Sequence, residues 1–90
     1  MNKGELIDKV AGEIGVTKKE AKKTVESVFE VITDCLGKGD AVRLVGFGTF
    51  GVRHRDERMA RNPRTGEKIK VQAMNVPFFK AGRELKEKVK

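Results

Sequence analysis

One stretch of this chain, residues 53–70, is too polar to belong to a hydrophobic core. It reads RHRDERMARNPRTGEKIK, and its only apolar residues are Met59, Ala60 and Ile69. No strand or helix made from it can bury a face, because burying unpaired charges is costly. Asn62-Pro63-Arg64-Thr65-Gly66 supplies turn residues at its centre. We therefore predict an arm in which two strands and a turn project into solvent. A disordered loop is the alternative, and the two are compatible if the arm orders only on binding.

The rest of the chain leaves roughly seventy residues for a core, within a length that allows only one domain, residues 1–90. Domains this small usually need a further source of stability. An internal disulfide is excluded because Cys35 is the only cysteine, and a metal site is disfavoured because His54 is the only histidine. The apolar neighbours of Cys35 indicate a small buried residue. We therefore predict an obligate dimer, whose shared core contains Phe29, Ile32, Leu36, Leu44, Phe47, Phe50 and Phe79.

Residues 1–40 carry the signals of two helices, and we expect them to form the helical, dimer-forming part. Asn2 with Glu5 and Thr17 with Glu20 are capping boxes. Gly15 is placed to end the first helix, and Gly37 and Gly39 to end the second. Apolar residues recur between these signals at helical spacing: Leu6, Ile7, Val10, Ala11 and Ile14, then Ala21, Val25, Val28, Phe29, Ile32 and Leu36.

Four lysines crowd the start of the second helix, where the helix dipole disfavours cations. They are Lys18, Lys19, Lys22 and Lys23. We expect a solvated face partly balanced by Glu26 and Glu30, and contact with phosphate is the alternative.

The hydrophobic period changes to two at Ala41, so residues 41–76 are expected to form a sheet from which the arm extends. Val42 and Leu44 predict one strand, and Phe50 and Val52 a second. A third begins near Lys68 and is expected to end at Pro77. Residues 77–90 then form a C-terminal part, with Phe78 and Phe79 as core anchors and Leu85 and Val89 on the inner face of a short helix. The predicted fold is α+β in the order α-α-β-β-β-α.

The positive charge lies in the second half of the chain. Residues 1–52 have no net charge, residues 53–70 carry +4 and residues 71–90 carry +3, which gives +7 in all. A basic chain of this kind points to a polyanion, either a nucleic acid or an acidic membrane surface. No apolar run is long enough to span a bilayer, and the N-terminus is charged where a signal peptide is apolar. We therefore expect a cytoplasmic protein.

The sequence contains one misleading motif and no catalytic constellation. Gly46-Phe-Gly-Thr-Phe-Gly51 matches the dinucleotide-binding pattern G-x-G-x-x-G, but a strand follows it where that site needs a helix. Its glycines are expected to allow a tight turn with Phe47 and Phe50 pointing inward, and an amide contact with phosphate stays open. Asp56 and Glu57 lie among arginines, which suits local ion pairs. We expect no enzyme activity, no cofactor, no metal and no small-molecule substrate.

Five of the seven arginines lie in the predicted arm: Arg53, Arg55, Arg58, Arg61 and Arg64. Arginine is favoured over lysine where a weakly hydrated, planar cation enters a narrow groove of negative potential. A merely solubilising hairpin is the alternative. Since an exposed cationic hairpin stabilises no core, binding is the better interpretation.

These residues identify a family resemblance over the whole chain. The segment GFGTFGVRHRDERMARNPRTG resembles the signature of the bacterial HU-type histone-like proteins, which include integration host factor, and VPFFKAGRELK resembles their entry into the last helix. The resemblance implies an intertwined homodimer with a helical base and two extended β-hairpin arms. It also implies that the arms hold the minor groove of double-stranded DNA, bend it and compact it.

The resemblance also implies roles for individual residues. Pro63 at the arm tip would wedge between base pairs, with Asn62 beside it, and Arg55, Arg58 and Arg61 would line the groove. The remaining DNA contacts would come from Lys3, Arg53, Arg64, Lys70, Lys80, Arg83 and Lys86. Met59-Ala60 departs from the family pattern at a place where arm flexibility can change. Ala81 departs from it near the start of the last helix, where we expect a mild effect.

Sequence specificity is expected to be low, because no element resembles a major-groove recognition helix. We expect a preference for bent, nicked or gapped DNA, and a location in the nucleoid. A strong sequence preference would indicate a role like that of integration host factor. An RNA-binding protein is less consistent with the absence of Trp and Tyr. A membrane-surface protein would need a longer and more apolar basic helix.

Overall fold

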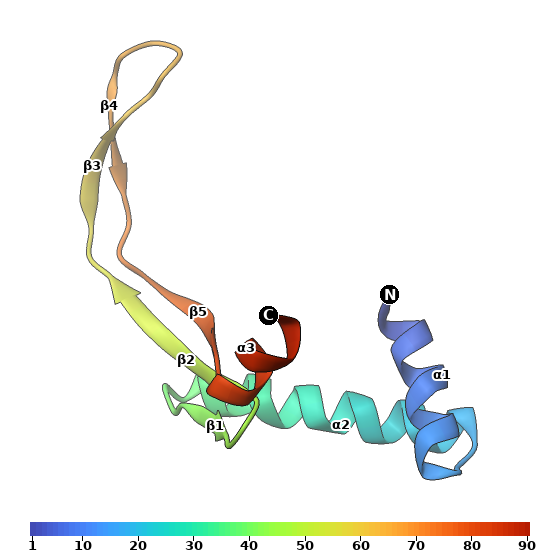
Figure 1. Ribbon diagram of the computed structural model, residues 1–90. Coiled ribbons are helices and arrows are strands. Elements are labelled where there is room, and N and C mark those ends of the chain that lie inside the picture. Colours follow the sequence, from blue (N-terminus) through green and yellow to red (C-terminus); the bar gives the residue numbers. More distant parts are fainter. The chain divides into compact units, whose positions relative to one another are not determined.

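The computed structural model describes all residues from Met1 to Lys90. It contains three helices and five strands (Figure 1). In chain order they are α1 (Lys3–Ile14), α2 (Lys18–Gly37), β1 (Val42–Leu44), β2 (Gly48–Arg55), β3 (Arg58–Arg61), β4 (Lys68–Val71), β5 (Met74–Ala81) and α3 (Arg83–Val89). The succession of two helices, strands and a final helix confirms the predicted α+β class. The chain divides into two compact units, Met1–Asp34 and Cys35–Lys90.

Both predicted helix starts are confirmed by their hydrogen bonds. The side chain of Asn2 accepts the backbone N–H of Glu5 at 2.9 Å, at the N-cap of α1. The hydroxyl of Thr17 accepts the N–H of Glu20 at 3.2 Å, before α2. Each bond satisfies an N–H that has no partner within its helix. Gly15 ends α1 in the left-handed conformation, with φ of 69°.

The first unit has a small core between α1 and α2. Its buried side chains are Ile7, Ala11, Ala21 and Val25, with Leu6, Val10 and Val16 packed against them. Two ion pairs flank these helices: Lys3 lies 3.4 Å from Glu26, and Lys18 lies 3.5 Å from Asp8. Lys18 is exposed, as we expected for the lysines of α2, but its acidic partner is Asp8 of α1, and Glu26 is paired with Lys3 instead.

The second unit is built on an antiparallel sheet with the strand order β1-β2-β5. The pairing of β2 with β5 extends over eight residue pairs, from Gly48 opposite Ala81 to Arg55 opposite Met74. β1 adds three further pairs on the other side of β2, from Val42 opposite Phe50 to Leu44 opposite Gly48. The two strands of this longest pairing, β2 and β5, are also the two that continue into the arm.

The glycines of the misleading G-x-G-x-x-G motif have structural roles. Gly46 adopts a φ of 84° in the turn before β2, a conformation that side-chain-bearing residues rarely adopt. Gly48 and Gly51 are both buried beneath aromatic rings of β5, since a Cβ atom there would lie 2.5 Å from Phe79 and 2.6 Å from Phe78. Phe79 also stacks on Phe50, with ring centroids 4.8 Å apart. The glycines thus make room for the phenylalanines.

The last helix is attached to the sheet by one short hydrogen bond. The N–H of Gly82, the N-cap residue of α3, is donated to the carbonyl of Phe47 at 2.7 Å. Leu85 is half-buried, as an inner-face residue should be, but Val89 is 77% exposed. The prediction of an inner-face position is therefore confirmed for Leu85 and wrong for Val89.

The prediction that Pro77 ends a strand is wrong. Pro77 lies inside β5, opposite Val52, and the strand continues to Ala81. β5 is an edge strand, so its outer side makes no ladder hydrogen bonds. A proline, which lacks an N–H, can therefore be placed there without the loss of such a bond. Phe78 and Phe79 therefore lie in the sheet, and the C-terminal helix begins only at Arg83.

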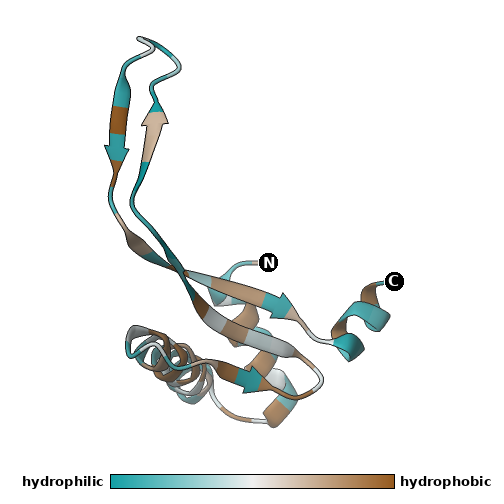
Figure 2. Cartoon of the chain, turned by 90° about the vertical axis from the view of Figure 1, so that its left-hand side faces the viewer, coloured by the Kyte–Doolittle hydropathy of each residue, from teal (hydrophilic) through white to brown (hydrophobic).

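None of the seven residues predicted for a shared core is buried within the single chain. Phe29, Leu44, Phe47 and Phe79 are exposed, and Ile32, Leu36 and Phe50 are half-buried. Cys35, predicted to be buried, is also only half-buried. Figure 2 shows hydrophobic residues along α2 and the sheet strands. Many of the large ones are exposed in the single chain.

We predict that Gly48→Ala destabilises the protein while Gly12→Ala stabilises it. An added methyl at position 48 would lie 2.6 Å from the carbonyl oxygen of Lys80, whereas nothing lies within 4 Å of one at position 12. The expected changes in the free energy of unfolding are a loss of about 1–3 kcal/mol and a gain of about 0.5–1 kcal/mol. Urea denaturation at a fixed protein concentration measures both, and a harmless Gly48→Ala would contradict the packing described.

Candidate nucleic-acid interface

The arm is a two-stranded ribbon formed by β3 and β4 (Figure 1). Residues 56–57 and 72–73 connect it to the sheet, and these short links lie outside the strands. The predicted hairpin thus exists, but its two long strands are each interrupted, which raises the number of strands from three to five. Arg53 and Arg55, predicted to lie in the arm, belong to β2.

The arm tip, residues 62–67, is held by local hydrogen bonds. The N–H of Asn62 is donated to the carbonyl of Glu67, and the N–H of Gly66 to the carbonyl of Asn62, both at 2.8 Å. The side chain of Asn62 accepts the N–H of Arg64 at 2.9 Å, which forms an Asx turn around Pro63. Gly66 has a φ of 75°. Pro63 and Arg64 remain exposed at the end of this ordered turn.

The register of the ribbon gives it two different faces, because directly opposed residues of an antiparallel pair point to the same side. On one face Met59 lies opposite Lys70 and Arg61 opposite Lys68; on the other, Arg58 lies opposite Val71 and Ala60 opposite Ile69. One face is therefore mainly cationic. The other is apolar except for Arg58. Figure 2 shows the resulting alternation of hydrophilic and hydrophobic residues along β4.

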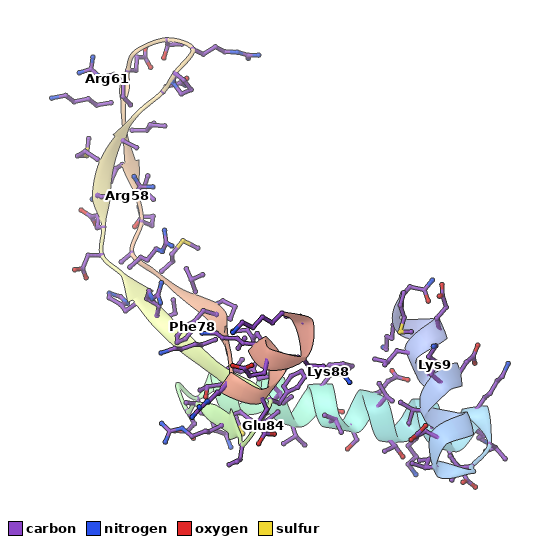
Figure 3. The ribbon with its side chains drawn as sticks, in the orientation of Figure 1. Lys9, Arg58, Arg61, Phe78, Glu84 and Lys88 are labelled. Atoms are coloured by element: carbon purple, nitrogen blue, oxygen red, sulfur yellow. The ribbon has the colours of Figure 1, made fainter.

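The structure does not bring Arg55, Arg58 and Arg61 together on one face. Arg58 and Arg61 lie on opposite faces of the ribbon, and Arg55 lies in the sheet opposite Met74. Figure 3 places Arg58 along the arm and Arg61 closer to the tip. Lys68, which shares a face with Arg61, was not among the predicted contact residues. Counting outward from the Asn62–Glu67 turn would have placed Lys68 opposite Arg61.

The remaining predicted contacts come from several elements. The guanidinium of Arg53 lies 4.9 Å from the centre of the Phe78 ring, a cation–π contact typically worth about 0.5–1 kcal/mol at an exposed site. Lys80 lies in β5 opposite Thr49. Arg83 and Lys86 share one side of α3 at a spacing of three residues. Lys3, in the first unit, is engaged with Glu26.

No arginine of residues 53–70 takes part in an ion pair. Asp56 lies 3.1 Å from His54 and Glu57 lies 3.4 Å from Lys70, so both carboxylates make the local pairs that we expected, with partners other than the arginines. All five arginines are exposed. The arm therefore presents guanidinium groups whose charge no carboxylate of the chain neutralises by contact.

Other kinds of site find no support in the side-chain arrangement. No group of three or more His, Cys, Asp or Glu residues could hold a metal ion. No helix has the length and apolar character needed to cross a membrane.

Comparisons with known proteins agree with a nucleic-acid interface. The sequence pattern of the family described as bacterial DNA-binding protein matches residues 1–90. DNA-binding protein HU-alpha of Serratia marcescens and DNA-binding protein HU of Geobacillus stearothermophilus are each 53% identical over 90 residues, which is 100% of both chains. The Anabaena HU–DNA cocrystal structure matches with a TM-score of 0.91 and 48% identity, over 99% of this chain and 97% of that one. HU from Thermotoga maritima matches with a TM-score of 0.73 and 41% identity, over 100% of both.

Proposed function

This chain belongs to the bacterial DNA-binding protein family as an HU-type, non-enzymatic member, and we propose that it bends and compacts double-stranded DNA by gripping the minor groove. The observation that carries the proposal is the exposed arm, whose arginines make no ion pair within the chain. A ribbon of only two strands is narrow, and guanidinium groups are favoured in a narrow groove of negative potential. The Anabaena relative is described as a complex with DNA.

The two faces of the arm suit different parts of the groove. The apolar face, with Ala60, Ile69 and Val71, is suited to the sugar edges and the floor. The opposite face, with Arg61, Lys68 and Lys70, is suited to the phosphates. Arg58 would reach into the groove from the apolar face. Backbone contacts of this kind carry little sequence information, so the proposed binding has low specificity.

Pro63 is proposed as the wedge that kinks the duplex. It is exposed, it has no N–H to desolvate, and the Asx turn of Asn62 holds it at the tip. Unstacking one base step costs a few kcal/mol, which is offset when bent DNA reaches more protein surface. That further surface would include Lys3, Arg53, Arg64, Lys80, Arg83 and Lys86. DNA already bent, nicked or gapped would cost less to deform, and should be preferred.

We also propose that the working form is a homodimer with two arms. Only four hydrophobic side chains of the chain are buried, which is too few to stabilise a domain of this size. An apolar hollow of about 270 Å³ in the first unit is lined by Leu6, Val10, Thr24, Val25, Val28 and Phe29. A second copy is the natural occupant, since its own exposed α2 residues are equally apolar. Binding to chromosomal DNA would place the dimer in the cytoplasm, in the nucleoid.

The function is tested by fluorescence-anisotropy binding to linear duplex, gapped duplex and matched duplex RNA across a salt series. We expect DNA affinity to fall steeply with salt, and the gapped duplex to bind most tightly. Equal binding to all three would mean that the arms act only as a cationic patch.

Arg58→Ala combined with Arg61→Ala should weaken binding to unrelated DNA sequences about equally. The slope of log affinity against log salt should fall by about one for each phosphate that the variant no longer neutralises. Lys38→Ala combined with Arg43→Ala removes the same charge outside the arm and should change binding much less. Equal losses of affinity in both double variants would mean that net charge, and not the arm, governs binding.

Pro63→Ala should reduce the bending of DNA while much of the binding remains. FRET between dyes at the two ends of a duplex measures the bend, and transfer should fall toward the value of free DNA because the wedge is absent. Pro77→Ala changes the only other proline, which lies in the sheet, and should leave the bend unchanged. Undiminished bending by Pro63→Ala would rule out the wedge.

The dimer should be the only folded species at micromolar concentration in analytical ultracentrifugation. Phe29→Ala should lower the stability of the assembly by about 3–5 kcal/mol if the ring is buried by a second copy. Val31→Ala, also on α2 but off its apolar stripe, should cost much less. A folded monomer would contradict the proposal.

A further inference from the structure

His54 lies at the root of the arm, as the second-last residue of β2. Its Nδ1 atom is 2.9 Å from the side-chain oxygen of Asn75, which lies opposite it on β5. Its Nε2 atom is 3.1 Å from a carboxylate oxygen of Asp56. One imidazole ring therefore contacts both strands of the sheet's longest pairing and the residue that follows β2.

Asp56 lies in a link where the strand pairing is interrupted. The last pair of the sheet is Arg55 with Met74, and the first pair of the arm is Arg58 with Val71. The backbone between these pairs has no ladder hydrogen bonds to set the direction of the arm. The contact between His54 and Asp56 is a side-chain restraint across the start of this link.

The protonation state of the ring decides whether both contacts can be made with the side chains as they stand. A neutral imidazole has one N–H and one acceptor nitrogen, whereas an imidazolium has two N–H donors. The two atoms that face the ring, from Asp56 and Asn75, are both oxygens. On loss of a proton, one contact must be given up or the amide of Asn75 must turn over, and the charge attraction to Asp56 disappears.

We propose that His54 is a positioning residue that fixes the direction of the arm when protonated and releases it when neutral. The arm is then held more firmly at pH 5.5, where more of the rings carry the second proton, than at pH 8. This property belongs to the free protein. Its consequence for DNA bending rests on the proposed function.

No other ionisable group competes for the ring among the contacts around it. Arg53 and Arg55 are on the opposite face of β2, because side chains alternate along a strand. Glu57 is engaged with Lys70. The shallow groove beside Asn75 is lined by Leu36, Gly37, Val52 and Pro77, none of which titrates. Asp56 is therefore the charged partner on which the proposed pH dependence of the arm rests.

The test is the ¹⁵N heteronuclear NOE of the arm amides in the full-length free protein at pH 5.5 and pH 8. We expect the arm values, over residues 58–61 and 68–71, to fall at pH 8 while those of β2 and β5 stay constant. Exposed ion pairs contribute little free energy, and the pair of His54 and Asp56 is exposed. The population of released arms should therefore change only about two- to fivefold between the two pH values. Asp56→Asn and His54→Gln should both remove the pH dependence.

Glu57→Gln is the matched control. It removes a neighbouring carboxylate that faces Lys70, and it should keep the pH dependence of the wild type. An arm whose NOE values do not change with pH, or a pH response that survives Asp56→Asn, would overturn the proposal. Loss of the response in Glu57→Gln would also overturn it, since general electrostatics would then be the cause.

DNA bending is measured separately, by the FRET assay at the same two pH values. A protein that fails to bind DNA but keeps the pH response of its arm would disprove the proposed function and leave the role of His54 intact. A protein that bends DNA but shows no pH response of its arm would disprove the role of His54 and leave the proposed function intact.

Discussion

The pairing of β2 with β5 is the interaction on which the second unit depends. Its eight residue pairs connect the turn that holds α3, at Gly48 and Ala81, to the root of the arm, at Arg55 and Met74. It also places the rings of Phe78 and Phe79 over Gly51 and Gly48. Any shift of register would place these rings against side chains, because moving a strand by one residue reverses every face. The glycines and phenylalanines thus specify one register, and that register fixes where the arm leaves the sheet.

The arm has the opposite energetic character. It contributes almost no buried apolar surface, and its order depends on a few backbone hydrogen bonds, the Asx turn at Asn62 and one exposed ion pair. Local segments of this kind open at low free-energy cost. Under the proposed function, an arm of such marginal stability can adapt to DNA while the sheet that supports it keeps its geometry. This difference in stability between arm and sheet follows from where the apolar residues lie along the chain.

Much of the fold could be predicted from the sequence wherever a short-range signal has one physical meaning. The caps at Asn2 and Thr17 and the turn around Pro63 were predicted because their hydrogen bonds form within a few residues. Pro77 misled the prediction, since its effect depends on whether its strand is at an edge, which is a property of the whole sheet. The faces of Arg58 and Arg61 also depend on long-range register. The pairing of Asp56 with His54 could not be expected from charge alone, because Arg55 adjoins Asp56 and Arg58 is as near to it in sequence as His54.

The open edges of the arm have a consequence for self-association. β3 and β4 pair only with each other, so the outer edge of each strand presents free backbone groups to solvent. Such edges can recruit strands from other molecules and start fibril growth. Four of the eight paired residues of the ribbon are basic, namely Arg58, Arg61, Lys68 and Lys70. Two ribbons that approached edge to edge would bring like charges together, so these cations disfavour edge-to-edge pairing of neighbouring copies. Under the proposed function, this protection would act where copies are crowded along one DNA molecule.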